Sequence, residues 1–241
     1  DTETKRLLEQ LARAQNADGG WPWMPGGGSN DYITLYITTG FARLRHLGVK
    51  DVPVGQAVKA LGRLDDWITK RYDRIVENKT QKNNNLDSTV ALYLYCRSFY
   101  LEDRPVGQAH QRAFDYFARQ AHKHWLKVGS RQSQAHVAIA LHRLGSTAVA
   151  GDVVKSILEH SVTDEELGMY WRDTEHSWWW HRAPIETQAM MIEAFNEITG
   201  DKDAVRECQI WLIKQKQTQA WKTTKATADA VYSILLGGDN L

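Results

Sequence analysis

The chain has 241 residues, a formal charge of +1 and no run of like charges. That balance makes nucleic acids and anionic membranes poor partners, because both attract strongly basic surfaces. No apolar stretch approaches the roughly 20 residues of a membrane span, and the N-terminal residues lack the apolar core of a signal peptide. A chain of this length can bury a core without disulfides, so we interpret its two cysteines, Cys96 and Cys208, as buried free thiols.

Apolar residues recur at helical spacing along almost the whole chain, whereas two-residue alternation is nearly absent. One such series is Ile33, Tyr36, Ile37, Phe41 and Leu44. The sequence therefore predicts an all-α protein with helices at residues 2–16, 31–47, 55–77, 86–99, 105–123, 131–144, 148–161, 184–198, 201–216 and 225–237.

The predicted helices alternate between two kinds. Those that begin near residues 31, 86, 131, 184 and 225 carry small or apolar residues on most faces, which is typical of buried helices. Those that begin near residues 2, 55, 105, 148 and 201 are amphipathic and charged, which suits an outer layer. We therefore expect a series of hairpins, each made of one outer and one inner helix.

An internal repeat supports this organisation. The pattern Asp-x-Pro-Val-Gly-Gln-Ala occurs at Asp51–Ala57 and at Asp103–Ala109, a spacing of 52 residues. In each copy the proline presets φ for a first helical turn and the aspartate can accept from free N–H groups there, which predicts a helix start. Gly48 and Gly145 each follow an apolar helical run and predict a left-handed helix end.

Five outer-inner hairpins describe most of a closed ring of hairpins, the α/α toroid. We predict one such domain over residues 1–241, with about five of six hairpins present. The first hairpin would lie before residue 1, and its absence would leave a gap or a partly exposed inner wall beside the helices near residues 31 and 225.

The tryptophans gather in the predicted outer-to-inner turns. A candidate contact surface for a neighbouring domain consists of Trp21, Trp23, Trp178, Trp179 and Trp180. The alternative is that these rings pack on neighbouring loops. Trp221 precedes the last predicted helix, where we expect it to be buried.

A second function is suggested by the loop from Trp171 to His181, which combines tryptophans with Asp173, Glu175, His176 and His181. Such a loop could line a carbohydrate groove, so the alternative is an α/α-toroid enzyme, either a polysaccharide lyase or glycosidase, or a terpene cyclase-like protein. The segment Gln15–Trp21 does resemble the Gln-Trp repeats of triterpene cyclases. These enzymes need a clustered Asp-x-Asp-Asp acid.

The acid and metal chemistry of such enzymes is not evident elsewhere in the sequence. The only acidic pair near a tryptophan is Asp65-Asp66, which we interpret as a solvated face of an outer helix. Tetrahedral zinc needs converging ligands, but the two cysteines lie on different predicted helices, and His122 and His124 point to different faces of one helix. We therefore expect neither a metal nor a cofactor.

The C-terminal third resembles the end of the thioester domain of bacterial α2-macroglobulins. The resemblance rests on three ordered segments and on an early turn, Gln15–Trp23, that matches a Gln-x-x-x-Gly-Gly-aromatic pattern. The three segments are Pro184-Ile185-Glu186-Thr187-Gln188-Ala189, Trp211-Leu212-Ile213-Lys214-Gln215-Lys216-Gln217, and Trp221 to Ala230.

The resemblance implies the body of a domain in a broad-range protease-trapping inhibitor, periplasmic or exposed at the cell surface. It implies contacts with neighbouring domains of the same polypeptide, target proteases bound through the full-length protein, and no catalysis. The family's hallmark is Cys-x-Glu-Gln, which forms a thioester. Neither Cys96-Arg97-Ser98-Phe99 nor Cys208-Gln209-Ile210-Trp211 matches it, and no histidine, His136 and His181 included, can be assigned a role in transacylation.

Overall fold

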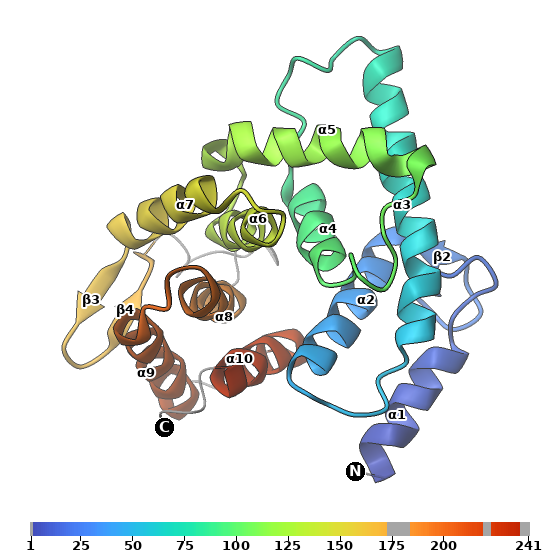
Figure 1. Cartoon of the computed structure of the whole chain (residues 1–241). Helices are drawn as coiled ribbons and strands as arrows, with labels where there is room; N and C mark the ends of the chain where they lie inside the picture. Colours follow the sequence, from blue (N-terminus) through green and yellow to red (C-terminus); the bar gives the residue numbers. More distant parts are fainter. Residues whose placement is uncertain (1, 173–183, 219–222, 237–241) are drawn as a thin grey trace. The chain divides into compact units, whose positions relative to one another are not determined.

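A computed structural model describes residues 2–172, 184–218 and 223–236. This part of the chain is all-α, as the sequence predicts, with two short β-hairpins in the turns (Figure 1). The helices are α1 (Thr2–Arg13), α2 (Asp31–His46), α3 (Val54–Glu77), α4 (Ser88–Ser98), α5 (Gln108–His124), the 3₁₀ turn η1 (Trp125–Lys127), α6 (Arg131–Arg143), α7 (Thr147–Glu159), α8 (Pro184–Ala194), its π-helical end η4 (Phe195–Thr199), α9 (Lys202–Thr218) and α10 (Thr224–Leu236).

The chain forms two compact units. The first comprises Asp1–Asn85 with Leu92–Gln120, and the second comprises Leu86–Ala91 with Ala121–Leu241. The prediction that all the hairpins form one ring stays a prediction.

In the first unit, α2 packs along α3, and α4 contacts both of them. The contact with α2 includes the Arg43 guanidinium, whose Nε donates to the Tyr95 hydroxyl at 3.1 Å. The contact with α3 is made through Tyr93, whose hydroxyl donates to Asp65 at 2.7 Å. The core of this unit consists of side chains that water does not reach, among them Leu35, Phe41, Leu61, Leu64 and Phe117.

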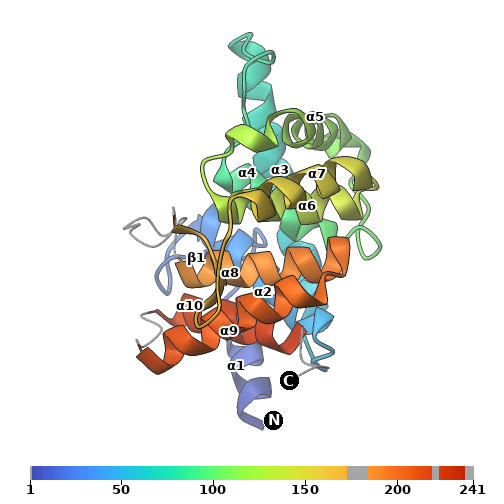
Figure 2. The same cartoon turned by 90° about the vertical axis from the view of Figure 1, so that its left-hand side faces the viewer.

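In the second unit, the inner and outer layers follow the predicted alternation. Helix α8 packs between α6 and α10, while α7 covers α6 and α9 covers α8 (Figure 2). Residues 132–141 of α6 and 186–194 of α8 are all buried, which explains why these helices are apolar or small on most faces. Within this unit the predicted amphipathic outer helices are found in α7 and α9, and the predicted buried inner helices in α6 and α8. Helix α10, also predicted to be buried, leaves Val231 and Leu235 44% and 58% exposed.

The predicted left-handed helix ends are confirmed at two glycines. Gly48 has φ of 78° and Gly145 has φ of 88°. After α6, the Gly145 N–H donates to the His142 carbonyl and the Ser146 N–H reaches back to the Leu141 carbonyl. The same pair of bonds follows α2, and it satisfies carbonyls that have no partner inside the helix.

The predicted capping by Asp51 and Asp103 is wrong, although helices do start near both copies of the repeat. No side chain caps α3, which follows Pro53, and Asp51 itself has φ of 63°. Asp103 lies too far before Gln108 to reach the first turn of α5. Its carboxylate instead receives two hydrogen bonds from Arg45, at 2.7 and 2.8 Å, because a charged bidentate partner is stronger than a lone backbone N–H.

The two β-hairpins were not predicted. Strand β1 (Trp21–Pro22) pairs with β2 (Ser29–Asn30), and β3 (Val162–Asp164) pairs with β4 (Gly168–Tyr170), both antiparallel. Strands of two or three residues are too short to show a two-residue period. In the described residues, none of the helices combines the length and the apolar character needed to cross a membrane.

Candidate functional site

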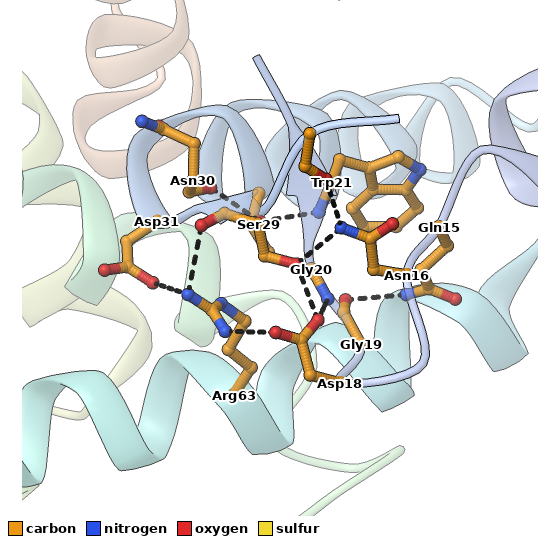
Figure 3. Close-up of polar contacts among 12 residues, drawn as sticks. Gln15, Asn16, Asp18, Gly19, Gly20, Trp21, Ser29, Asn30, Asp31 and Arg63 are labelled. Carbon is orange, nitrogen blue, oxygen red and sulfur yellow. Dashed lines mark hydrogen bonds and ion pairs between the residues drawn. The ribbon is translucent and has the colours of Figure 1, made fainter. Parts of the chain in front are cut away.

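The turn between α1 and α2 carries two of the predicted contact tryptophans, Trp21 and Trp23, and its backbone is fixed on α3 (Figure 3). Gly19 has φ of 87°, and a Cβ there would lie 2.7 Å from the Lys59 carbonyl oxygen, so only glycine fits. The Gln15 side-chain amide donates both to the Gly19 carbonyl, at 2.8 Å, and to the Gln56 carbonyl in α3, at 2.9 Å. One glutamine therefore joins the turn to a helix that lies 41 residues further along the chain.

An ionic network holds the next part of the turn. Asp18 accepts from the Ser29 hydroxyl at 2.6 Å and from the Gly20 N–H at 3.0 Å. Arg63 of α3 contacts Asp18 at 2.6 Å and Asp31 at 2.8 Å. The hydrogen bond from Ser29, then that from Gly20, and the positive charge of Arg63 lower the pKa of Asp18. The carboxylate is therefore ionised throughout the neutral pH range, and the network does not depend on pH there.

Two asparagines complete the base of the β1–β2 hairpin. The Asn16 side-chain amide donates to the Gly27 carbonyl at 3.1 Å and to the Ser29 hydroxyl at 3.0 Å. The Asn30 side chain accepts from the Ile33 N–H at 3.0 Å and so caps α2. The hairpin and the helix that follows it are therefore held as one piece (Figure 3).

Trp21 and Trp23, two residues apart, lie in opposite environments. Trp21 is only 1% exposed. Its indole N–H donates to the Leu11 carbonyl at 2.7 Å, and its ring meets Phe41 edge-on with centroids 5.8 Å apart. Trp21 is therefore part of the core and does not belong to an exposed contact surface, because its polar edge already has a partner within the unit. Trp23 is 67% exposed, and Trp178, Trp179 and Trp180 lie outside the described residues.

The second unit builds a similar turn from the same residue types. Gly168 has φ of 80°, and a Cβ there would lie 2.3 Å from the Glu207 carbonyl oxygen of α9. The Gln188 amide donates to the Met169 carbonyl at 2.6 Å and to the Cys208 carbonyl at 3.3 Å. The buried Trp171 donates its indole N–H to the Ile157 carbonyl at 2.9 Å. In each unit, therefore, a glycine, a glutamine and a tryptophan together fix a turn against a neighbouring helix.

The residues named for the enzyme alternative, Asp173, Glu175, His176 and His181, lie outside the described residues, as does Trp221. His136 is buried on α6. The interpretation of Asp65 as part of a solvated face is wrong. Asp65 is fully buried and forms an ion pair with Arg97 at 3.1 Å, because its position on α3 turns it toward α4. Asp66, the next residue, does face solvent.

The contact between α3 and α5 includes a hydroxyl, an imidazole and a carboxylate in series. Thr69 Oγ1 lies 2.9 Å from His110 Nδ1, and His110 Nε2 lies 3.5 Å from Asp66. The Thr69 hydroxyl, however, donates its single proton to the Asp65 carbonyl one turn earlier, at 2.8 Å. His110 Nδ1 is then the donor to Thr69 and cannot act as its base. The series links two helices and does not form a nucleophile.

The two cysteines are free and buried, as the sequence predicts. Burial raises the pKa of the Cys96 thiol to about 12 and raises that of Cys208 well above its ordinary value. Both thiols are therefore protonated at neutral pH and are poor nucleophiles. Over residues 2–172, 184–218 and 223–236, no three His, Cys, Asp or Glu side chains gather in a way that could hold a metal ion.

A charged cluster on α8 and α10 was missed by sequence reasoning. Lys225 lies 3.7 Å from Glu186 and 3.4 Å from Asp229, and both carboxylates are buried. Burial raises the pKa of Glu186, and the charge of Lys225 opposes that shift. The i, i+4 spacing of Lys225 and Asp229 was visible in the sequence, but nothing there shows that α8 and α10 are neighbours.

Comparison with solved structures relates this fold to α2-macroglobulin from Escherichia coli. The native protein, spanning the residues from domain MG7 to the C-terminus, matches 100% of this chain with a TM-score of 0.60 and 13% identity, and 35% of that chain is covered. The same protein activated by porcine elastase matches 98% of this chain with a TM-score of 0.59 and 16% identity, and 19% of that chain is covered. A scan against known protein families and a search of curated proteins find no match. The chain therefore has the fold of one part of Escherichia coli α2-macroglobulin.

Proposed function

We propose that this chain is the helical body of a thioester-like domain in a larger bacterial protein that traps proteases as α2-macroglobulins do. Its own role is structural: it supports the reactive or moving parts of the larger protein and catalyses no reaction. The observation that carries the proposal is the agreement in fold over the full length of the chain with a protein that elastase activates.

The local structure supports a structural role. In the described residues, the strongly polar features serve packing: Asp65 neutralises Arg97, Asp18 fixes a turn, and His110 links two helices. Both thiols are buried and protonated. An enzyme needs a nucleophile or an acid-base pair that a substrate can reach, and none of these groups offers one.

The finer parts of the proposal rest on the family resemblance. The larger protein would lie in the periplasm or at the cell surface, and it would contact target proteases. Its remaining domains would be the immediate partners of this chain. Our proposal also includes closure of the hairpins into one ring, completed by a first hairpin upstream.

The coding sequence upstream of Asp1 offers a direct test. A reading frame that continues upstream into a further helical hairpin and β-rich domains would support the proposal. A start codon immediately before Asp1 would contradict it. A Cys-x-Glu-Gln within roughly one hundred upstream residues would further place a thioester on the proposed upstream hairpin.

Treatment of the 241-residue chain with methylamine tests its lack of reactive chemistry. Neither cysteine is followed by the Glu-Gln that a thioester needs, so intact-mass spectrometry should show no covalent adduct. Denatured chain serves as the control for nonspecific labelling. An adduct that forms only on the native chain would show an acylating bond and refute a purely structural role.

A further inference from the structure

We propose that the tip of the β1–β2 hairpin, residues 23–28, docks on another domain of the same polypeptide, with Trp23 and Met24 as its anchors. This inference rests on the proposed function, because it requires a larger polypeptide. Trp23 is 67% exposed and Met24 is 65% exposed, and every residue from 23 to 28 is exposed. Two large apolar side chains thus stand together in water at the end of a hairpin.

The tip is ordered by a hydrogen bond of its own and by its turn geometry. The Gly27 N–H donates to the Met24 carbonyl at 3.0 Å, and Gly26, which follows Pro25, has φ of 78°. Proline followed by a glycine of positive φ is the signature of a type II turn. Below the turn, Asn16 holds the Gly27 carbonyl, and Arg63 fixes Asp18 and Asp31 (Figure 3).

An ordered turn of this kind is a suitable position for side chains that anchor a protein partner. Because the backbone that carries Trp23 is already ordered, little backbone entropy is lost on binding, and Trp and Met are both enriched at protein interfaces. Gly26 and Gly28 have no side chains and border open space, because a Cβ at either position would meet no atom within 4 Å. A partner's backbone can therefore approach the turn closely.

The size of the tip decides which partner fits. Its two anchors offer about 300 Å² of apolar surface, whereas a stable complex between separate proteins buries about 800 Å² on each side. A free protein or a second copy would therefore bind too weakly. A tethered domain is different, because the linker holds it at high effective concentration and a small contact suffices. In both solved α2-macroglobulin structures the matched region is joined to a much longer remainder, since this chain covers 35% and 19% of them.

Hydroxyl-radical footprinting tests the proposal, because Trp and Met side chains oxidise readily when exposed. The 241-residue chain and the longer polypeptide that contains it are labelled in parallel, and the peptide with Trp23 and Met24 is quantified. We expect oxidation of this peptide to fall at least five-fold in the longer polypeptide. Leu126, which is 63% exposed in η1, serves as the internal control and should change less than two-fold.

A Trp23→Ser variant makes the test specific. In the longer polypeptide, the substitution should restore oxidation of Met24 to the level seen in the 241-residue chain. In the 241-residue chain, the same substitution should leave the melting temperature unchanged. Equal oxidation of Trp23 in both proteins, or continued protection of Met24 in the variant, overturns the docking. Protection that rises with the concentration of the 241-residue chain overturns it in favour of self-association. The proposed function fails separately, if the gene encodes no further domains. Footprinting does not test that outcome.

Discussion

Burial separates two tryptophans that are nearly adjacent in the chain, and a pair of variants measures the difference. Trp21 fills the core and its indole N–H has a backbone partner. Trp21→Ala should therefore lower the free energy of unfolding by about 3–5 kcal/mol. Trp23→Ala should change it by less than about 0.5 kcal/mol, because the side chain is exposed. Urea unfolding followed by circular dichroism gives both values. Similar losses for the two variants would refute the assignment of one to the core and the other to the surface.

The buried Glu186 should make stability depend on pH. Burial raises its pKa in the folded chain, so its contribution to stability is complete below the ordinary glutamate pKa and is lost as the pH rises through the folded value. A Glu186→Gln variant cannot ionise there. Its stability relative to the wild type should therefore increase as the pH rises from 5 to 8.

Urea unfolding at several pH values measures this difference, with Glu165→Gln as a control for the loss of one exposed negative charge. A difference between Glu186→Gln and wild type that stays constant would show that burial and the charge of Lys225 cancel. A difference that decreases with rising pH would show that the carboxylate is stabilised in its ionised form. The attraction to Lys225 would then outweigh the effect of burial.

At the residue scale, the sequence predicted features that depend on local chemistry. The helix ends at Gly48 and Gly145 were predictable because a glycine directly after an apolar helical run is itself the signal for a left-handed helix end. Asp65 and Asp51 were misinterpreted because their partners and backbone angles depend on the tertiary fold. The pairing of Asp65 with Arg97 joins residues 32 apart, and no spacing rule connects them. The network of Asp18, Ser29 and Arg63 was missed for the same reason.

At the scale of elements, the close approach of the β3–β4 hairpin to α9 can be tested at one glycine. Gly168 and Gly26 both have φ near 80°, but only Gly168 would place a Cβ against a carbonyl oxygen, at 2.3 Å. Gly26→Ala should lower the free energy of unfolding by about 1–2 kcal/mol, the cost of a left-handed alanine. Gly168→Ala should lower it by about 3 kcal/mol or more, because the hairpin must also move away from α9. Thermal and urea unfolding of both variants measure these changes. Equal losses of stability would show that the close packing of Gly168 against α9 adds nothing to the cost of the left-handed backbone.

Helices were the most predictable elements, since their periodicity extends over many residues. The α2 helix was predicted at residues 31–47 and spans Asp31–His46, and α6 was predicted at 131–144 and spans Arg131–Arg143. The β-hairpins were not predicted because their positions depend on contacts with other elements. Gly19 packs against α3, and Gly168 packs against α9. The turns were nevertheless correctly expected to hold tryptophans.

At the scale of the whole molecule, the alternation of helix types predicted the layered helices found in the second unit. It could not fix which polar groups meet across hairpins, because those pairs depend on helix rotation. Of the tryptophans predicted to form a contact surface, Trp23 is exposed and Trp21 belongs to the core, so a contact through Trp23 stays a prediction. The likeness to α2-macroglobulin at 13–16% identity shows that two chains with mostly different side chains can share a fold.

A protease-trapping assay tests the central claim most directly. The larger polypeptide that we propose to contain this chain is incubated with elastase, and residual activity is measured on a large protein substrate and on a small peptide substrate. Elastase blocked at its active site beforehand controls for simple adsorption. A trap encloses the protease without blocking its active site, so activity on the large substrate should be lost while activity on the small peptide remains. Equal activity on both substrates, whether retained or lost, would contradict the account.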